Sequence, residues 1–182
     1  MLHTPKTGKF FTAENATQLK TIGLPLDGSE ECERLTLAGL IIAPLLELST
    51  ADGATTTSEF AVLEESIKRI EREFELATKE DIESLATPMG LLPIMNPEWK
   101  EADFTLARSI LADVLSRCEE EGHHAIRNFI ASGALLVADA SGGLLHLLTI
   151  SRNERSILHV IIEDLGLSEC AEGLHLIGKI ER

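Results

Sequence analysis

The sequence is poor in aromatic residues. It has no tyrosine, one tryptophan and six phenylalanines among 182 residues, so aromatic side chains make up only 4% of the chain. The interior must therefore be built from Leu, Ile, Val and Ala, a composition that favours packed helices over a β-sandwich. Hydrophobic residues at 44% and charged residues at 25% are ordinary for a globular chain of one domain.

Basic residues are also scarce. Sixteen Lys and Arg stand against thirty Asp and Glu, which gives a formal net charge of −14. A field of that sign repels phosphate backbones and anionic lipids, so the composition argues against nucleic acid and membrane surfaces as partners. It favours a cation or, as we expect, a protein partner with a basic surface.

The few cysteines and the absence of a long apolar run point to a cytoplasmic protein. Cys32, Cys118 and Cys170 are an odd number with no CxxC pair, which is typical of reduced thiols rather than of a disulfide framework. Residues 1–6 lack the apolar core of a signal peptide. The most apolar run, residues 37–46, is shorter than the roughly 20 residues that span a bilayer, so we expect no membrane insertion.

The hydrophobic pattern predicts an all-α fold of about seven helices. Residues 29–50 are apolar on most faces, so we expect a buried helix that Ser29 caps and that Pro44 kinks or splits. In the second part of the chain, we expect Pro97 to open a helix and Gly122 to end it.

The domain organisation follows from where this periodicity begins and where it is interrupted. Residues 1–28 show little periodicity and are expected to form a loosely ordered lead-in. Residues 29–182 are expected to form one helical domain, with a first half at 29–87, a linker at 88–97 and a second half at 98–182. The residues expected to attach the lead-in to the domain are Phe10, Phe11 and the stretch 22–26.

Two acidic turns suggest an internal duplication. Each copy has an apolar helix, then an Ala-Asp turn, then a capping box that opens an amphipathic helix, and the second copy has eight extra residues between its Asp and its Glu. The turns and capping boxes are 51–53 with Thr56 and Glu59 in the first copy, and 138–142 with Ser151 and Glu154 in the second.

This pattern resembles the tellurite-resistance TerB-like domains, whose hallmark is an apolar helix running into Ala-Asp-Gly, a short polar turn and a glutamate opening the next helix. The resemblance covers residues 29–182 and departs from the family pattern at Ala140, which replaces a glycine, and in the insertion 143–150. It implies an all-helical fold of two related halves and a non-enzymatic interaction module associated with tellurite and other chemical stress. It also implies a divalent-cation site, which carried over to this sequence comprises Asp52, Glu59, Asp139 and Glu154.

The acidic turns also have a purely structural interpretation. Asp52 makes an Asx-turn, Gly53 adopts a positive φ and Glu59 closes a capping box. A hard cation such as Ca²⁺ takes roughly six to eight oxygen ligands, so one turn supplies too few and a cation site needs carboxylates from more than one element. Both interpretations stay open at the level of sequence.

A second candidate metal site is the segment of Glu120, Glu121, His123 and His124. It contains two overlapping Glu-x-x-His pairs, a spacing found in di-iron helical bundles, and it would make the chain a metal-dependent helical-bundle enzyme or a metal-storage protein. Such a site needs two helices with this motif, whereas the sequence has one. No GxSxG, GxxxxGK[ST], GxGxxG or HExxH motif occurs, so we favour a function without catalysis.

Overall fold

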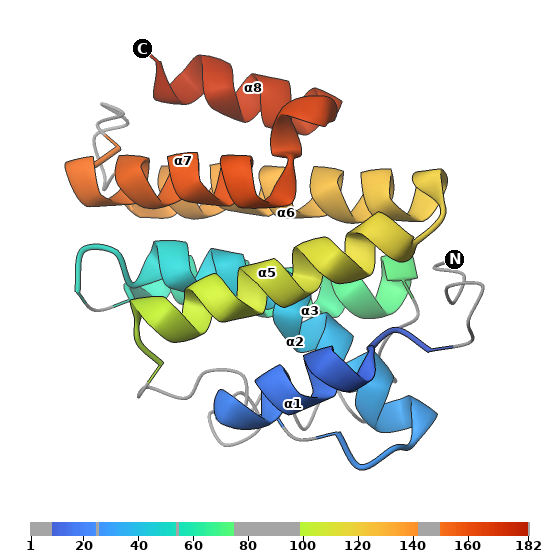
Figure 1. Cartoon of the computed structure of the whole chain (residues 1–182). Helices are drawn as coiled ribbons and strands as arrows, with labels where there is room; N and C mark the ends of the chain where they lie inside the picture. The colour runs from blue at the N-terminus through green and yellow to red at the C-terminus, as the bar shows by residue number, and fades with distance from the viewer. Residues whose placement is uncertain (1–8, 25, 54, 75–98, 142–149, 182) are drawn as a thin grey trace.

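A computed structural model of the chain describes residues 9–24, 26–53, 55–74, 99–141 and 150–181 (Figure 1). The regular elements of the described residues are all helices and no strand occurs among them, which confirms the all-α class. The predicted linker at 88–97 lies outside the described residues. The elements are α1 (Ala13–Thr21), α2 (Glu30–Ser49), α3 (Thr57–Phe74), α5 (Glu101–Arg117), α6 (Glu120–Ser141), α7 (Arg152–Leu165), the 3₁₀ turn η1 (Leu167–Glu169) and α8 (Ala171–Ile180).

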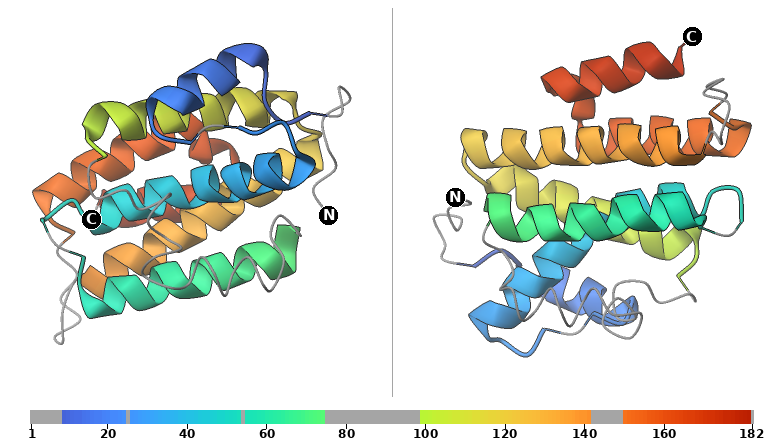
Figure 2. Two further views of the ribbon diagram at one scale, coloured as in Figure 1. Left: turned by 90° about the horizontal axis from the view of Figure 1, so that it is seen from below. Right: turned by 180° about the vertical axis from the view of Figure 1, so that it is seen from behind.

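Helix α2 is the buried centre of the fold. It packs against α3, α5, α6 and α7, and Figure 2 shows it between its neighbours in the view from below. Its residues 36–49 are buried, as expected for a helix that is apolar on most faces. Ser29 caps it as predicted, because its Oγ accepts a hydrogen bond from the Cys32 N–H at 3.1 Å. Pro44 lies within one continuous helix, so the predicted split does not occur.

Helix α6 is the second central element. It packs against α2, α3, α5, α7 and α8, and α8 covers it on the side away from α2 (Figure 1). Its contact with α2 is close at Gly133, where an added Cβ would lie 2.7 Å from Cδ1 of Leu45. A larger residue at position 133 would have to displace the Leu45 side chain, so glycine helps the two central helices to pack closely. None of the described helices combines the length and the apolar character needed to cross a bilayer.

Part of the predicted loose lead-in is an ordered element, and that prediction is corrected for residues 9–24. Helix α1 begins with a capping box in which the side chains of Thr12 and Asn15 each accept the other residue's backbone N–H. Phe10 and Phe11 are buried in the common core, which confirms their expected attachment to the domain. The Nε1–H of Trp99 donates to the Ile22 carbonyl at 2.9 Å, so contacts with distant residues stabilise a segment whose own periodicity is weak.

The break between α5 and α6 also differs from the prediction. Helix α5 begins at Glu101, and Pro97 lies outside the described residues. The helix ends at Arg117 because Cys118 has an extended backbone, with φ −72° and ψ 161°. Gly122 therefore lies in the first turn of α6 instead of ending a helix. A glycine inside a helix costs only about 1 kcal/mol, which the burial of a 22-residue helix readily offsets.

Candidate functional site

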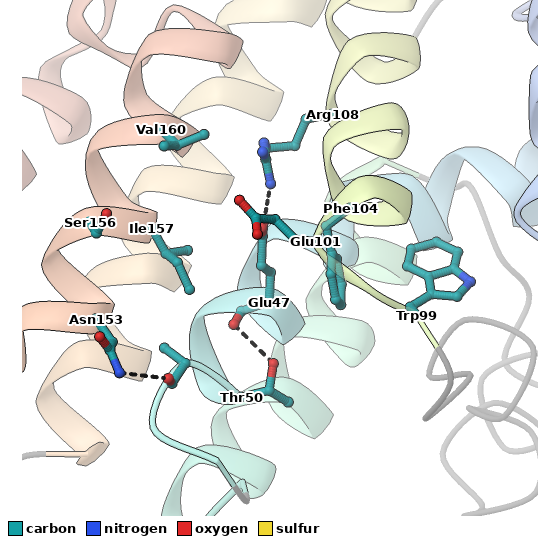
Figure 3. Close-up of a pocket in the computed structure, with 11 residues that line it drawn as sticks. Glu47, Thr50, Trp99, Glu101, Phe104, Arg108, Asn153, Ser156, Ile157 and Val160 are labelled. Carbon is teal, nitrogen blue, oxygen red and sulfur yellow. Dashed lines mark hydrogen bonds and ion pairs between the residues drawn. The ribbon is translucent and has the colours of Figure 1, made fainter.

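An open cavity of about 420 Å³ lies between the end of α2, the start of α5 and the outer face of α7 (Figure 3). That volume is in the range of small-ligand sites in proteins, which are roughly 300–1,000 Å³. Three segments far apart in the sequence form it. Its lining residues are Glu47, Thr50, Ala51, Trp99, Glu101, Phe104, Arg108, Asn153, Ser156, Ile157 and Val160.

One wall of the cavity contains a buried ion pair between Glu47 of α2 and Arg108 of α5. Only 8% of the Glu47 side chain and 3% of the Arg108 side chain are exposed. Nη1 of Arg108 donates to Glu47 Oε2, Nε donates to Oδ2 of Asp164 at 2.8 Å, and Nη2 donates to Oγ1 of Thr105 at 3.2 Å. All three nitrogens of this guanidinium are thus engaged by the protein itself.

The electrostatics of the pair follow from its burial. Removal from water raises the pKa of the Glu47 carboxyl, and the hydrogen bond from Arg108 opposes that rise. Glu47 also stands near the C-terminal end of α2, where the helix dipole is negative and a carboxylate is unfavourable unless a cation meets it. Arg108 supplies that cation, so each charge depends on the other for its stability in the interior.

Aromatic and aliphatic side chains form the sides of the cavity. Trp99 and Phe104 stack edge to face with centroids 5.3 Å apart, and the Trp99 hydrogen bond to the α1 end holds the indole in place. Ile157 and Val160 face them from α7 (Figure 3). The cavity therefore has apolar sides, while Glu101 adds an exposed carboxylate at its opening.

The charge around the cavity is negative overall. Glu47, Glu101 and Asp164 contribute three carboxylates against the single guanidinium of Arg108, which leaves two negative charges. Among the described residues, only Oε2 of Glu47 accepts a side-chain hydrogen bond, and Oε1 has no donor. An acceptor oxygen beside apolar walls can receive a donor from a ligand.

The first predicted acidic turn makes structural contacts. Asp52 is exposed, and its Oδ1 accepts a hydrogen bond from the Ser151 hydroxyl at 2.8 Å, so the turn after α2 contacts the start of α7. Gly53 has a φ of 118°, as predicted for the turn. Both capping boxes are confirmed, because Glu59 accepts the Thr56 N–H at 2.7 Å and Glu154 accepts the Ser151 N–H at 2.8 Å.

Asp139 is placed differently from Asp52, and the predicted equivalence of the two turns is corrected here. Asp139 lies inside the last turn of α6 and forms an ion pair with Lys179 of α8. Ala140, unlike the glycine of the family pattern, allows the helix to continue to Ser141. Across the described ranges, no group of three or more His, Cys, Asp or Glu side chains is arranged to hold a metal ion, so Asp52, Glu59, Asp139 and Glu154 do not form one cluster.

The alternative metal residues all lie at the start of α6. Glu120 and Glu121 are exposed, and His124 Nε2 lies 3.8 Å from Glu120 Oε1. The His123 and His124 rings meet edge to face with centroids 4.6 Å apart, and burial, together with the nearby Arg127 and His124, lowers the pKa of His123. These contacts belong to one helix, whereas a di-iron site needs matching ligands from a second.

The residues of the cavity were missed at the level of sequence, although two of them carried a signal. Glu47 is the one charged residue in the stretch 37–48, and Arg108 interrupts the apolar stripe of α5 between Phe104 and Leu111. A charge on a buried stripe indicates a partner elsewhere in the fold. Comparison of the chain with protein-family models, with curated proteins and with solved structures finds no match.

Proposed function

We propose that this chain is a non-enzymatic helical interaction module that binds its partner at the cavity between α2, α5 and α7. The observation that carries the proposal is the buried Glu47–Arg108 pair in the wall of an open cavity lined by both polar and apolar side chains. Replacing a buried ion pair by apolar residues is often neutral or stabilising, so stability alone is a weak reason to keep one. A concave apolar site with a few converging polar groups and a perturbed pKa is the usual form of a binding site.

Binding fits the lining of the cavity better than catalysis does. The described lining residues include no cysteine or histidine. The hydroxyl of Thr50 donates to the carbonyls of Leu46 and Glu47 within α2. The lining therefore offers shape, charge and acceptor oxygens, which suffice for recognition.

The proposal includes a TerB-like relationship and an organisation in two related halves. In its support, α2 and α6 both end in a serine whose hydroxyl donates to the carbonyl three residues earlier, Ser49 to Leu46 and Ser141 to Ala138, each at 2.9 Å. Both helices carry an acidic residue two positions before that serine. On this alignment the counterpart of Asp139 is Glu47 rather than Asp52.

The resemblance extends the proposal to tellurite and related chemical stress. A host strain that lacks the gene should grow less well on tellurite, and a copy encoding the intact chain should restore growth. Equal growth of the deletion strain and its parent across a tellurite series would remove the stress role while leaving the binding proposal untouched.

The binding site is tested by closing the cavity in the full chain. Ser156→Trp introduces a large side chain at an exposed lining position, and His159→Trp introduces one at an exposed α7 position that does not line the cavity. Small amine, carboxylate and neutral fragments are titrated into isotope-labelled protein while backbone amide NMR shifts are followed. The proposal expects shifts at the cavity residues that Ser156→Trp abolishes and His159→Trp preserves. The absence of shifts at those residues for every fragment would overturn it.

A further inference from the structure

We infer that the group received by this cavity is a lysine side chain of a basic partner protein. The inference rests on the proposed function and names the ligand chemistry of the same site. It draws on three features of the cavity: its charge, its carboxylate oxygens and the character of its walls.

The net negative charge around the cavity favours a cationic ligand. Two carboxylates, those of Glu47 and Asp164, pair with the one guanidinium, and three of its five N–H groups bond to Glu47, Asp164 and Thr105. An anionic ligand would compete with Glu47 and Asp164 for Arg108 and would meet the field of Glu101, which also lines the cavity. The whole chain, with its net charge of −14, attracts basic proteins over a longer range.

The single oxygen that Glu47 leaves without a donor favours an ammonium over a guanidinium at that carboxylate. A guanidinium binds best when two carboxylate oxygens receive its parallel N–H groups. Arg108 already occupies Oε2 of Glu47, so Oε1 is the oxygen of this carboxylate that has no donor among the described residues. A lysine ammonium is a compact donor that one oxygen can hold, with Glu101 available to share its charge.

The apolar walls of the cavity suit the aliphatic part of a lysine side chain. Phe104 of α5 and the pair Ile157 and Val160 of α7 line the same cavity as Glu47 (Figure 3). Lysine buries its four methylene groups against such surfaces while its charged end reaches a polar partner. The volume of about 420 Å³ exceeds what one lysine side chain needs, so an adjacent apolar side chain of the partner fits with it.

The probe is the peptide acetyl-Ala-Leu-Lys-Leu-Ala-amide, titrated into the full chain with amide NMR shifts as the readout. Matched peptides replace the lysine by Nε-acetyl-lysine, norleucine or arginine, and n-butylammonium represents a free amine. The lysine peptide should shift the cavity residues, and acetyl-lysine or norleucine should weaken binding roughly tenfold, the value of one charge-assisted hydrogen bond. Arginine should bind several-fold more weakly than lysine.

Variants of the protein test whether the lysine peptide binds at the cavity. Glu101→Gln should weaken the lysine peptide several-fold, whereas Glu163→Gln, at an exposed α7 position outside the lining, should leave its affinity unchanged. Ser156→Trp should abolish the shifts.

The outcomes separate this inference from the proposed function. If norleucine or arginine binds in the cavity as tightly as lysine, the site is real and the assignment of an ammonium ligand is wrong. If n-butylammonium binds and no peptide does, the ligand is a free amine and the protein source is wrong. If no probe shifts a cavity residue in this set or in the fragment series, the proposed function fails as well.

Discussion

Glu47 and Asp139 occupy the same position in two central helices and have very different surroundings. Each is an acidic residue two positions before the end of its helix, α2 or α6, and each pairs with a base from another helix. The Glu47–Arg108 pair is almost fully buried, whereas the side chains of Asp139 and Lys179 are 46% and 22% exposed. Both carboxylates need a cation, because each lies at the negative end of its helix. The tertiary packing decides how much each ion pair contributes to the stability of the fold.

The largest expected effect comes from removing the cation of the buried pair. Arg108→Met should destabilise the fold by about 3–5 kcal/mol in urea unfolding, because it leaves the Glu47 carboxylate buried without a partner. The double variant Glu47→Leu, Arg108→Met removes both charges and should recover most of that loss. If Arg108→Met alone were nearly as stable as the parent protein, the Glu47–Arg108 pair would not be buried in solution.

A smaller effect is expected at the two capping boxes. Thr56→Ala should cost about 1 kcal/mol, because it removes the side-chain cap of α3. Ser151→Ala removes the cap of α7 together with the hydrogen bond to Asp52, so it should cost more than Thr56→Ala. Thermal unfolding of both variants measures the difference. Equal losses would mean that the bond between Ser151 and Asp52 contributes nothing.

The exposed Asp139–Lys179 ion pair should contribute least to the stability of the fold. Lys179→Met is expected to cost less than about 1 kcal/mol, since a half-exposed ion pair gains little over its hydrated charges. Measurements at high salt distinguish the two ion pairs further. In 1 M NaCl the small stability loss of Lys179→Met should disappear, whereas the loss of Arg108→Met should remain largely intact. Similar costs at the two sites would break the distinction between them.

Divalent cations are expected to leave the acidic residues of the turns unaffected. Asp52, Glu59 and Glu154 accept hydrogen bonds from neighbouring groups, and Asp139 pairs with Lys179. Calorimetric titration with Ca²⁺, Mg²⁺, Zn²⁺ and Fe²⁺ should therefore give no saturable binding that Asp52→Asn plus Asp139→Asn abolishes. Stoichiometric binding that this double variant removes would restore the cation site of the TerB-like resemblance, and stoichiometric iron would favour the site at His123 and His124.

Local patterns predicted local features of the fold well. The two capping boxes and the cap at Ser29 depend on residues within one turn of each other, and the structure has all three. Gly122 and Asp139 were misplaced because their single-residue preferences are worth about 1 kcal/mol or less, and the burial of α6 overrides them.

The cavity could not be located from the sequence, because its walls come from three segments separated by tens of residues. Glu47 and Arg108 are 61 positions apart, and only the packing of α2 on α5 makes them partners. Each charge on an apolar stripe signalled that a partner existed. Neither showed which residue it was, or that a cavity lay beside the pair.

The most direct test of the binding site is a filtered NOE experiment on the lysine peptide bound to the full chain. The cavity predicts contacts between the lysine methylene protons and the methyl groups of Ile157 and Val160. Leu136 on α6 and Leu174 on α8 are large apolar side chains exposed elsewhere on the molecule, 48% and 61% respectively. NOEs to Ile157 and Val160 alone would support the site, and NOEs to Leu136 or Leu174 in their place would contradict it.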